Sequence, residues 1–255
     1  MNPLHQQIRN LLLKKSDEKI ARGAQRFFKN EINALGVKAK DVDDIAKNFY
    51  KENLKDQPKQ AIFDLAEMLF QSKFLEENGI ACQFVIISKK CYEKNDIFVF
   101  ERWIDKYVSN WAICDSFCNH AVGEIVEKFP GHIEILKKWS LSENLWLRRA
   151  SAVSLIIPSR KGLFLKEILE ISSNLLIDKE DMVQKGYGWL LKAASMTETM
   201  AKGDGKTKKK NFDTILNFIL NNKSVMPRTS LRYVIEKMPE DVRRLAMDKK
   251  NMVEK

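Results

Sequence analysis

Trp111 and Asp115 form the first pair of residues in this sequence whose types and spacing suggest chemistry. They lie in the stretch NWAICDSFC, residues 110–118, which otherwise carries apolar residues suited to the inside of a helix. Residues four apart share one face of a helix, so the indole and the carboxylate point the same way. Asp115 is therefore either a solvated acid beside the edge of the core or a carboxylate that lines a site with an indole.

Arg149 and Trp189 also interrupt otherwise apolar helical patterns. Asp115, Arg149 and Trp189 follow one another at intervals of 34 and 40 residues, which match the length of a helix-pair repeat. The intervals predict that the three side chains occupy the same face of successive repeats and converge on one concave surface. Taken alone, a tryptophan at helical spacing is most often a core residue, and an arginine in an apolar helix often extends to the surface.

Composition favours a polyanionic partner. The chain has 255 residues, 44% of them apolar, which excludes a disordered chain. Its net charge is +10 and its pI is near 9.3, a balance that favours nucleic acid first and an anionic membrane second. No run of eighteen or more apolar residues is present, and the amino terminus lacks the order of a signal peptide. We expect a soluble, cytoplasmic protein.

The spacing of two cysteines suggests a metal site, but the position of the nearby histidine argues against one. Cys114 and Cys118 are four residues apart with His120 nearby, but His120 points elsewhere on a helix and leaves only two ligands. Free cysteines pack as small hydrophobes, so we expect buried, reduced thiols and no metal.

Apolar residues recur at helical spacing along most of the chain, as in IFDLAEMLF (62–70), GHIEILKKW (131–139) and FDTILNFIL (212–220). Strand signals are nearly absent. About a dozen helices joined by short connections predict an all-α fold, an α-solenoid of stacked helix pairs that forms a single domain over residues 1–255. Helix starts are expected near Asp41, Pro58, Asn95, Asn110, Pro130, Ser142, Lys179 and Pro239.

The segment AKGDGKTKKK, residues 201–210, differs from the rest of the chain. It holds two glycines and five lysines and has no apolar face, so we expect a basic loop. The segment is either a solvated loop or a flexible arm that touches a phosphate backbone.

Six stretches, in order, resemble the bacterial DNA alkylation repair glycosylases of the AlkD type, which fold as HEAT-like helical repeats. They cover the chain from about residue 20 to 240: RFFKNEINALGVKAKD (26–41), SKFLEENGIACQF (72–84), NWAICDSFC, ENLWLRRASAV (143–153), DKEDMVQKGYGWLLKAAS (178–195) and MPRTSLRYVIEKMP (226–239). The resemblance implies excision of cationic N3- or N7-alkylated purines from duplex DNA without a metal or an organic cofactor.

The resemblance also implies roles for single residues. Asp115 matches the catalytic acid, Trp111 and Trp189 match two indoles that enclose the damaged nucleotide, and Arg149 matches an arginine that holds the DNA backbone. The family usually carries an acid directly after the first tryptophan, where this chain has Ala112. Because position 112 points about a quarter-turn away from Asp115, we expect this difference to change packing or capping more than chemistry.

Duplex DNA is the expected partner, bound by a basic concave face of a monomer that associates with the nucleoid and with no membrane. The expected backbone contacts are Arg148, Arg149, Lys185, Lys192, Arg228 and Arg232, with Lys38 and Lys40 nearer the amino terminus. Phe27 and Phe28 match a place where the family often has an aromatic residue near DNA, and a core role for at least one is equally expected. The alternative function is a non-catalytic helical-repeat module that binds DNA or protein.

Overall fold

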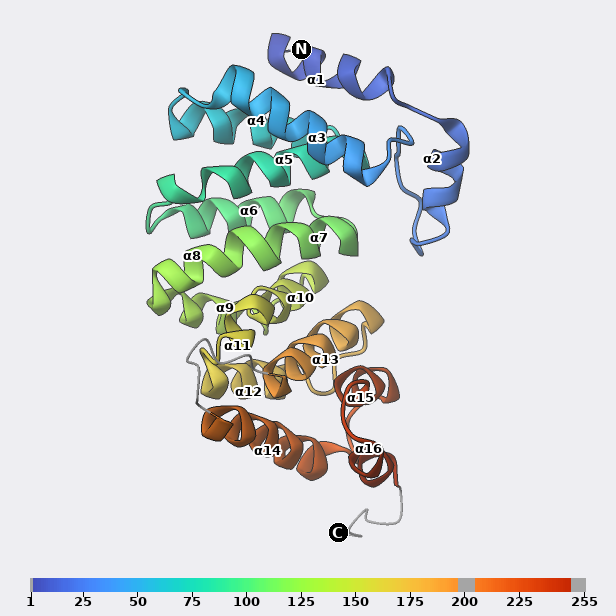
Figure 1. Cartoon of the computed structure of the whole chain (residues 1–255), viewed down its shortest axis with the longest axis vertical. Helices are drawn as coiled ribbons and strands as arrows, with labels where there is room; N and C mark the ends of the chain where they lie inside the picture. The colour runs from blue at the N-terminus through green and yellow to red at the C-terminus, as the bar shows by residue number, and fades with distance from the viewer. Residues whose placement is uncertain (1, 197–204, 249–255) are drawn as a thin grey trace. The chain divides into compact units, whose positions relative to one another are not determined.

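The computed structural model is mainly helical (Figure 1), and it describes residues 2–196 and 205–248, with only the backbone described for residues 205–208. Within those ranges the only β-contact is an isolated bridge between Asn33 and Phe74. The all-α helical-repeat prediction is therefore confirmed. None of the helices described is long and apolar enough to cross a membrane.

Contacts divide the chain into two compact units, Met1–Phe117 (unit 1) and Cys118–Lys255 (unit 2). A single domain over residues 1–255 stays a prediction. The α-helices of unit 1 are α1 (Pro3–Leu13), α2 (Glu18–Gln25), α3 (Ala39–Phe49), α4 (Lys59–Gln71), α5 (Leu75–Ile87), α6 (Asp96–Tyr107) and α7 (Trp111–Phe117). Two short helical turns follow α3 and α5, namely η1 (Tyr50–Leu54) and η2 (Ser88–Cys91).

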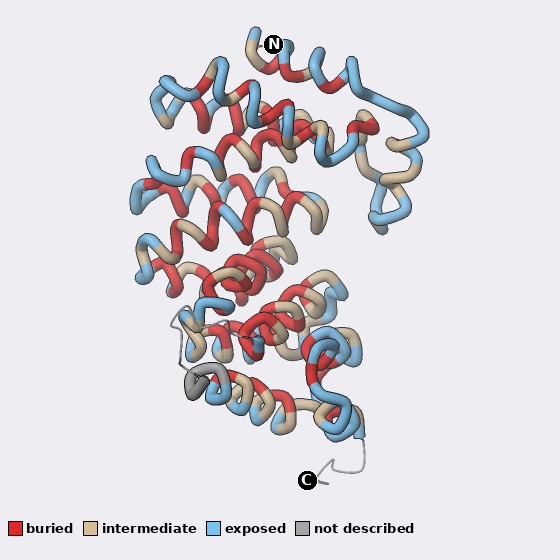
Figure 2. Tube along the Cα trace, in the orientation of Figure 1, coloured by how far each residue is buried: buried red, intermediate tan, exposed pale blue. Residues whose placement is uncertain are grey.

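The core of unit 1 follows from the spacing of its large apolar residues. Phe63 and Phe70 lie on the buried face of α4, seven residues apart. They form one cluster with Phe100, Trp103 and Phe117, in which neighbouring ring centroids are 5.2–6.1 Å apart. Burying each such ring contributes about 1.5–3 kcal/mol. The cluster fixes α7 through Phe117. Figure 2 shows buried residues along the stacked helices and none on α2.

Unit 2 contains nine α-helices within its described residues. They are α8 (Gly123–Lys128), α9 (Ile133–Trp139), α10 (Leu145–Val153), α11 (Ile156–Arg160), α12 (Leu165–Asn174), α13 (Asp181–Ser195), α14 (Gly205–Asn222), α15 (Arg228–Ile235) and α16 (Glu240–Met247). Two short turns complete it, η3 (Cys118–Val122) and η4 (Pro130–His132).

Helix α13 is the centre of unit 2 and packs against α10, α11, α14 and α15. It contains GYG at residues 186–188, and the two glycines allow close approach of its neighbours. An alanine at residue 188 would place a Cβ 2.9 Å from the Ser230 carbonyl oxygen and 2.8 Å from the Tyr233 Cβ. The glycine therefore sets how closely α13 and α15 cross.

The predicted basic loop at residues 201–210 is wrong in its second half. Residues 205–210 form the first turns of α14, and residues 201–204 lie outside the described residues. Among the described side chains of α14, the buried ones are Asn211, Ile215 and Ile219. Because lysine is a good helix former, the helix extends from these residues back into the basic ones.

Candidate functional site

Helix α7 presents Trp111 and Asp115 on the same face. Ile113, Cys114 and Phe117 are buried, whereas Trp111 and Asp115 are half-buried. Asn110 begins the helix by accepting a hydrogen bond from the backbone N–H of Ile113 at 3.0 Å. The buried face thus orients the indole and the carboxylate together, as their spacing predicts.

The indole of Trp111 is fixed by the segment that follows α2. Its Nε1 donates a hydrogen bond to the carbonyl oxygen of Phe27 at 3.1 Å. Its ring stacks on Phe28, with centroids 5.6 Å apart and planes 22° apart. The side chain of Phe27 remains 73% exposed. One phenylalanine therefore packs against the candidate site, and the other stays open to solvent.

Arg149 on α10 is buried, with 4% of its surface exposed. Its Nη1 donates to the carbonyl oxygen of Met182 at the start of α13. A Cβ at Gly186 would be 3.4 Å from Arg149 Cγ, so this glycine leaves room for the arginine. Arg149 thus joins α10 to α13, and its contact with a DNA backbone stays a prediction.

Trp189, one turn after Gly186, is half-buried and lines a pocket of about 350 Å³. Three cationic side chains line the same pocket, those of Arg160, Lys192 and Lys237. An indole among cations suits an anionic ligand with apolar edges, such as a sugar-phosphate chain. Sequence reasoning did not identify Arg160 or Lys237, because neither lies in a recognisable motif or a long basic run.

Tyr187 anchors this part of α13. Its hydroxyl oxygen lies 2.6 Å from Ser230 Oγ and 2.9 Å from the Leu176 carbonyl oxygen. Burial raises the pKa of Tyr187 to about 12, so the phenol stays neutral at physiological pH. The buried side chain therefore fixes the register of the helix that carries Trp189.

Besides Arg149, three of the expected backbone contacts have protein partners. Arg148 donates from Nε to Asp178 Oδ2 at 2.6 Å and from Nη1 to the carbonyl oxygens of Ser142 and Glu143. Lys185 pairs with Asp181 at 2.6 Å, and Lys192 pairs with Glu236 at 2.6 Å. These partners favour a structural role for Arg148. DNA contact by the three residues stays a prediction.

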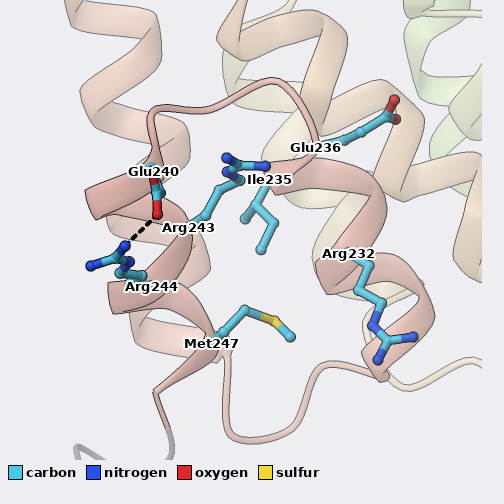
Figure 3. Close-up of a pocket in the computed structure, with 7 residues that line it drawn as sticks. All are labelled: Arg232, Ile235, Glu236, Glu240, Arg243, Arg244 and Met247. Carbon is cyan, nitrogen blue, oxygen red and sulfur yellow. Dashed lines mark hydrogen bonds and ion pairs between the residues drawn. The ribbon is translucent and has the colours of Figure 1, made fainter.

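The other four residues expected to contact the DNA backbone are exposed to solvent. Lys38, Lys40, Arg228 and Arg232 are exposed, and no hydrogen bond or ion pair joins their side chains to a described residue. Arg232 lines a pocket of about 450 Å³ between α15 and α16, drawn in Figure 3. Arg243 lines the same pocket without a described ion-pair partner, whereas Arg244 pairs with Glu240. Ile235 and Met247 supply apolar surface between these guanidinium groups.

The two neighbouring thiols pack as expected. Cys114 and Cys118 are fully buried, and neither forms a disulfide. Within residues 2–196 and 205–248 no group of three or more potential ligands could hold a metal ion. The convergence of Asp115 with Arg149 and Trp189 on one surface stays a prediction, because the first residue lies in unit 1 and the others lie in unit 2.

Comparisons with known proteins give a match to one family model and to a solved structure. Residues 8–238 match the family model described as DNA alkylation repair enzyme. The fold is similar to that of a solved structure described as a predicted DNA alkylation repair enzyme from Enterococcus faecalis, with a TM-score of 0.75 and 15% sequence identity. The match covers 89% of this chain and 98% of the other. No curated protein matches the sequence.

Proposed function

Since the chain belongs to the family of DNA alkylation repair enzymes, which supports a role in DNA repair, we propose that it is a DNA glycosylase. Its substrate is duplex DNA carrying cationic N3- or N7-alkylated purines. The observation that carries the proposal is the shared half-buried face of Trp111 and Asp115 on α7. A carboxylate beside an indole suits a site at which positive charge develops on a sugar.

When a purine is alkylated at N3 or N7, the base leaves easily, and stabilising the sugar becomes the difficult part of the reaction. The positive charge on the purine weakens its bond to C1′, and the departing base becomes neutral. The sugar then acquires oxocarbenium character, and a fixed carboxylate stabilises charge that appears mainly in the transition state. Asp115 supplies this carboxylate and could also orient or deprotonate the attacking water.

Indole side chains suit the same chemistry. The face of an indole attracts cationic groups and packs against sugar C–H edges without selecting a base. Trp111 is held by Phe27 and Phe28, and Trp189 lies among the cations of its pocket. Both indoles are half-buried, so each could contact a nucleotide while excluding water from it.

Affinity for DNA comes from cations that bind phosphates without reading sequence. The exposed Lys38, Arg228 and Arg232 are the strongest candidates, because their charges have no described ion-pair partner. Arg149 near the lesion completes this set in the proposal. We further propose a cytoplasmic monomer that acts on the chromosome without a cofactor.

A non-catalytic helical-repeat module is the second candidate. A helical-repeat fold serves DNA or protein binding without chemistry in many proteins. Asp115 distinguishes the two, since an acid in a phosphate-binding face would weaken binding and gives a pure binder no advantage.

The deciding experiment measures release of 7-methylguanine from methylated duplex DNA by the wild-type chain and by Asp115→Asn. We expect the variant to lose base release while its DNA affinity stays equal or rises slightly, because one negative charge is removed. Asp213→Asn on α14 is the matched control: it makes the same charge change at an exposed position and should release base normally.

Equal release by the wild type and Asp115→Asn would remove the role of Asp115. DNA binding without release by either protein would favour the binding module.

A further inference from the structure

The carboxylate of Glu76 on α5 receives three consecutive backbone N–H groups. Its Oε2 accepts from Leu35 at 2.9 Å, and its Oε1 accepts from Gly36 at 2.7 Å and from Val37 at 3.1 Å. The side chain lies inside unit 1, since Glu76 is 5% exposed. Hydrogen bonds from N–H groups to a carboxylate are roughly twice as strong as neutral ones, so Glu76 holds this turn firmly.

The turn held by Glu76 has, at residue 36, a backbone conformation and a close contact that only glycine can accommodate. Gly36 has φ +82°, and a Cβ there would be 2.0 Å from the carbonyl oxygen of Asp17. The Gly36 carbonyl oxygen accepts from the backbone N–H of Asp17 at 3.1 Å, and the Asn33 carbonyl oxygen accepts from that of Leu75 at 2.8 Å. The turn therefore joins the start of α2 to the start of α5.

Residues 26–37, named the bracing segment here, connect this turn to Trp111. Gln25 holds the other end of the segment: its Nε2 donates to the Asn30 carbonyl oxygen at 2.9 Å, and its Oε1 accepts from the Ile32 N–H at 3.0 Å. Between these ends lie Phe27 and Phe28, which contact the indole of Trp111.

Hydrogen bonds hold the bracing segment in place more than apolar packing does, because few of its residues are buried. No residue from 18 to 35 is buried, and α2 buries none of its residues. A segment with few buried apolar contacts opens locally at low free energy. Glu76 is the buried group with the most hydrogen bonds to the segment, so its loss should let Phe27 and Phe28 move away from Trp111.

We propose that Glu76 is a positioning residue for the glycosylase site: through the bracing segment it fixes the indole of Trp111 beside Asp115. The proposal rests on the proposed function for its catalytic consequence. The mechanical connection from Glu76 to Trp111 is independent of that function. Glu76 itself touches backbone N–H groups in this connection and acts only through the residues that they carry.

Glu76→Gln tests the connection in the full chain. The amide keeps the size of the side chain but replaces one acceptor oxygen with a donor, which must oppose a backbone N–H. The readout is the ¹H–¹⁵N resonance of the Trp111 indole, assigned by its loss in Trp111→Phe. We expect Glu76→Gln to shift or broaden this resonance and Glu76→Asp to restore it at least in part.

Glu77→Gln is the matched control, because the adjacent Glu77 is equally buried but binds His5 and Arg9 of α1 instead of the bracing segment. It should lower stability while leaving the indole resonance of Trp111 in place. An unchanged resonance in Glu76→Gln, or an equal shift in Glu77→Gln, overturns the proposal.

Two further measurements complete the test. In base release we expect Glu76→Gln to lower kcat about tenfold with little change in KM, since misplacement of a catalytic group affects the transition state more than binding. If Glu76→Gln does not fold, Gln25→Ala loosens the other end of the segment and should shift the same resonance; no shift would then overturn the proposal. If the wild type releases no base, the proposed function fails, and the indole resonance still decides the role of Glu76.

Discussion

Gly188 on α13 lies so close to Ser230 on α15 that a Cβ at residue 188 would be 2.9 Å from the Ser230 carbonyl oxygen. The next residue is Trp189, which lines the cationic pocket of unit 2. The crossing of the two helices therefore sets the position of the indole.

Gly188→Ala should destabilise the protein by about 1–3 kcal/mol, the usual effect of forcing an extra carbon into a packed contact. Denaturant unfolding followed by circular dichroism measures the change. Gly23→Ala on α2 is the control, because a Cβ there meets nothing within 4 Å; it should be neutral or stabilising by up to about 1 kcal/mol. Equal effects of the two substitutions would contradict the close crossing.

Arg232→Ala and Arg148→Ala should affect different properties, DNA binding in the first case and stability in the second. Arg232 is exposed without a described ion-pair partner, so its loss should weaken duplex binding and reduce the slope of log affinity against log salt by about 0.9, with stability unchanged. Arg148 is bound to Asp178 and to two carbonyl oxygens, so its loss should lower the melting temperature. Fluorescence anisotropy across a salt series and thermal unfolding check both. A lower melting temperature for Arg232→Ala together with weaker DNA binding for Arg148→Ala would contradict both assignments.

Acid should destabilise unit 1 through Glu77. Burial alone would raise the pKa of this carboxyl, but hydrogen bonds from Arg9, Ser72 and His5 outweigh it, and the pKa lies below the usual 4.5. Because the folded pKa is the lower one, this stabilisation is complete above pH 4.5 and is lost as the pH falls through the folded value. Urea midpoints measured across this range should fall steeply for the wild type and less for Glu77→Gln. Parallel curves would show that Glu77 does not contribute.

Base release should follow the charge of the adduct. A positively charged purine is a good leaving group because it departs as a neutral base. We therefore expect 7-methylguanine to be released and the neutral O6-methylguanine not to be released. Chromatography of bases released from duplexes that carry each lesion distinguishes them. Comparable release of the two would require general acid chemistry at the base and would remove the electrostatic role proposed for Asp115.

The sequence by itself determined the helical fold and the shared face of Trp111 and Asp115. Helical hydrogen bonds join residues four apart, so apolar periodicity and helix-start residues reveal them directly. The β-branched runs FVIIS (84–88) and SLIIPS (154–159) lie in or beside helices. The expected basic loop is wrong for residues 205–210, because their lysines extend a helix whose apolar residues begin only after them.

Only the tertiary structure decided which polar groups have partners. Trp111 receives its carbonyl contact from a residue 84 positions away, and Arg148 finds its carboxylate 30 positions away. Glu76 binds N–H groups 39 to 41 positions earlier in the chain. No local pattern encodes such pairs, because they depend on how packed helices bring distant turns together. The same acid or base therefore serves as scaffold or as open charge according to its neighbours in space.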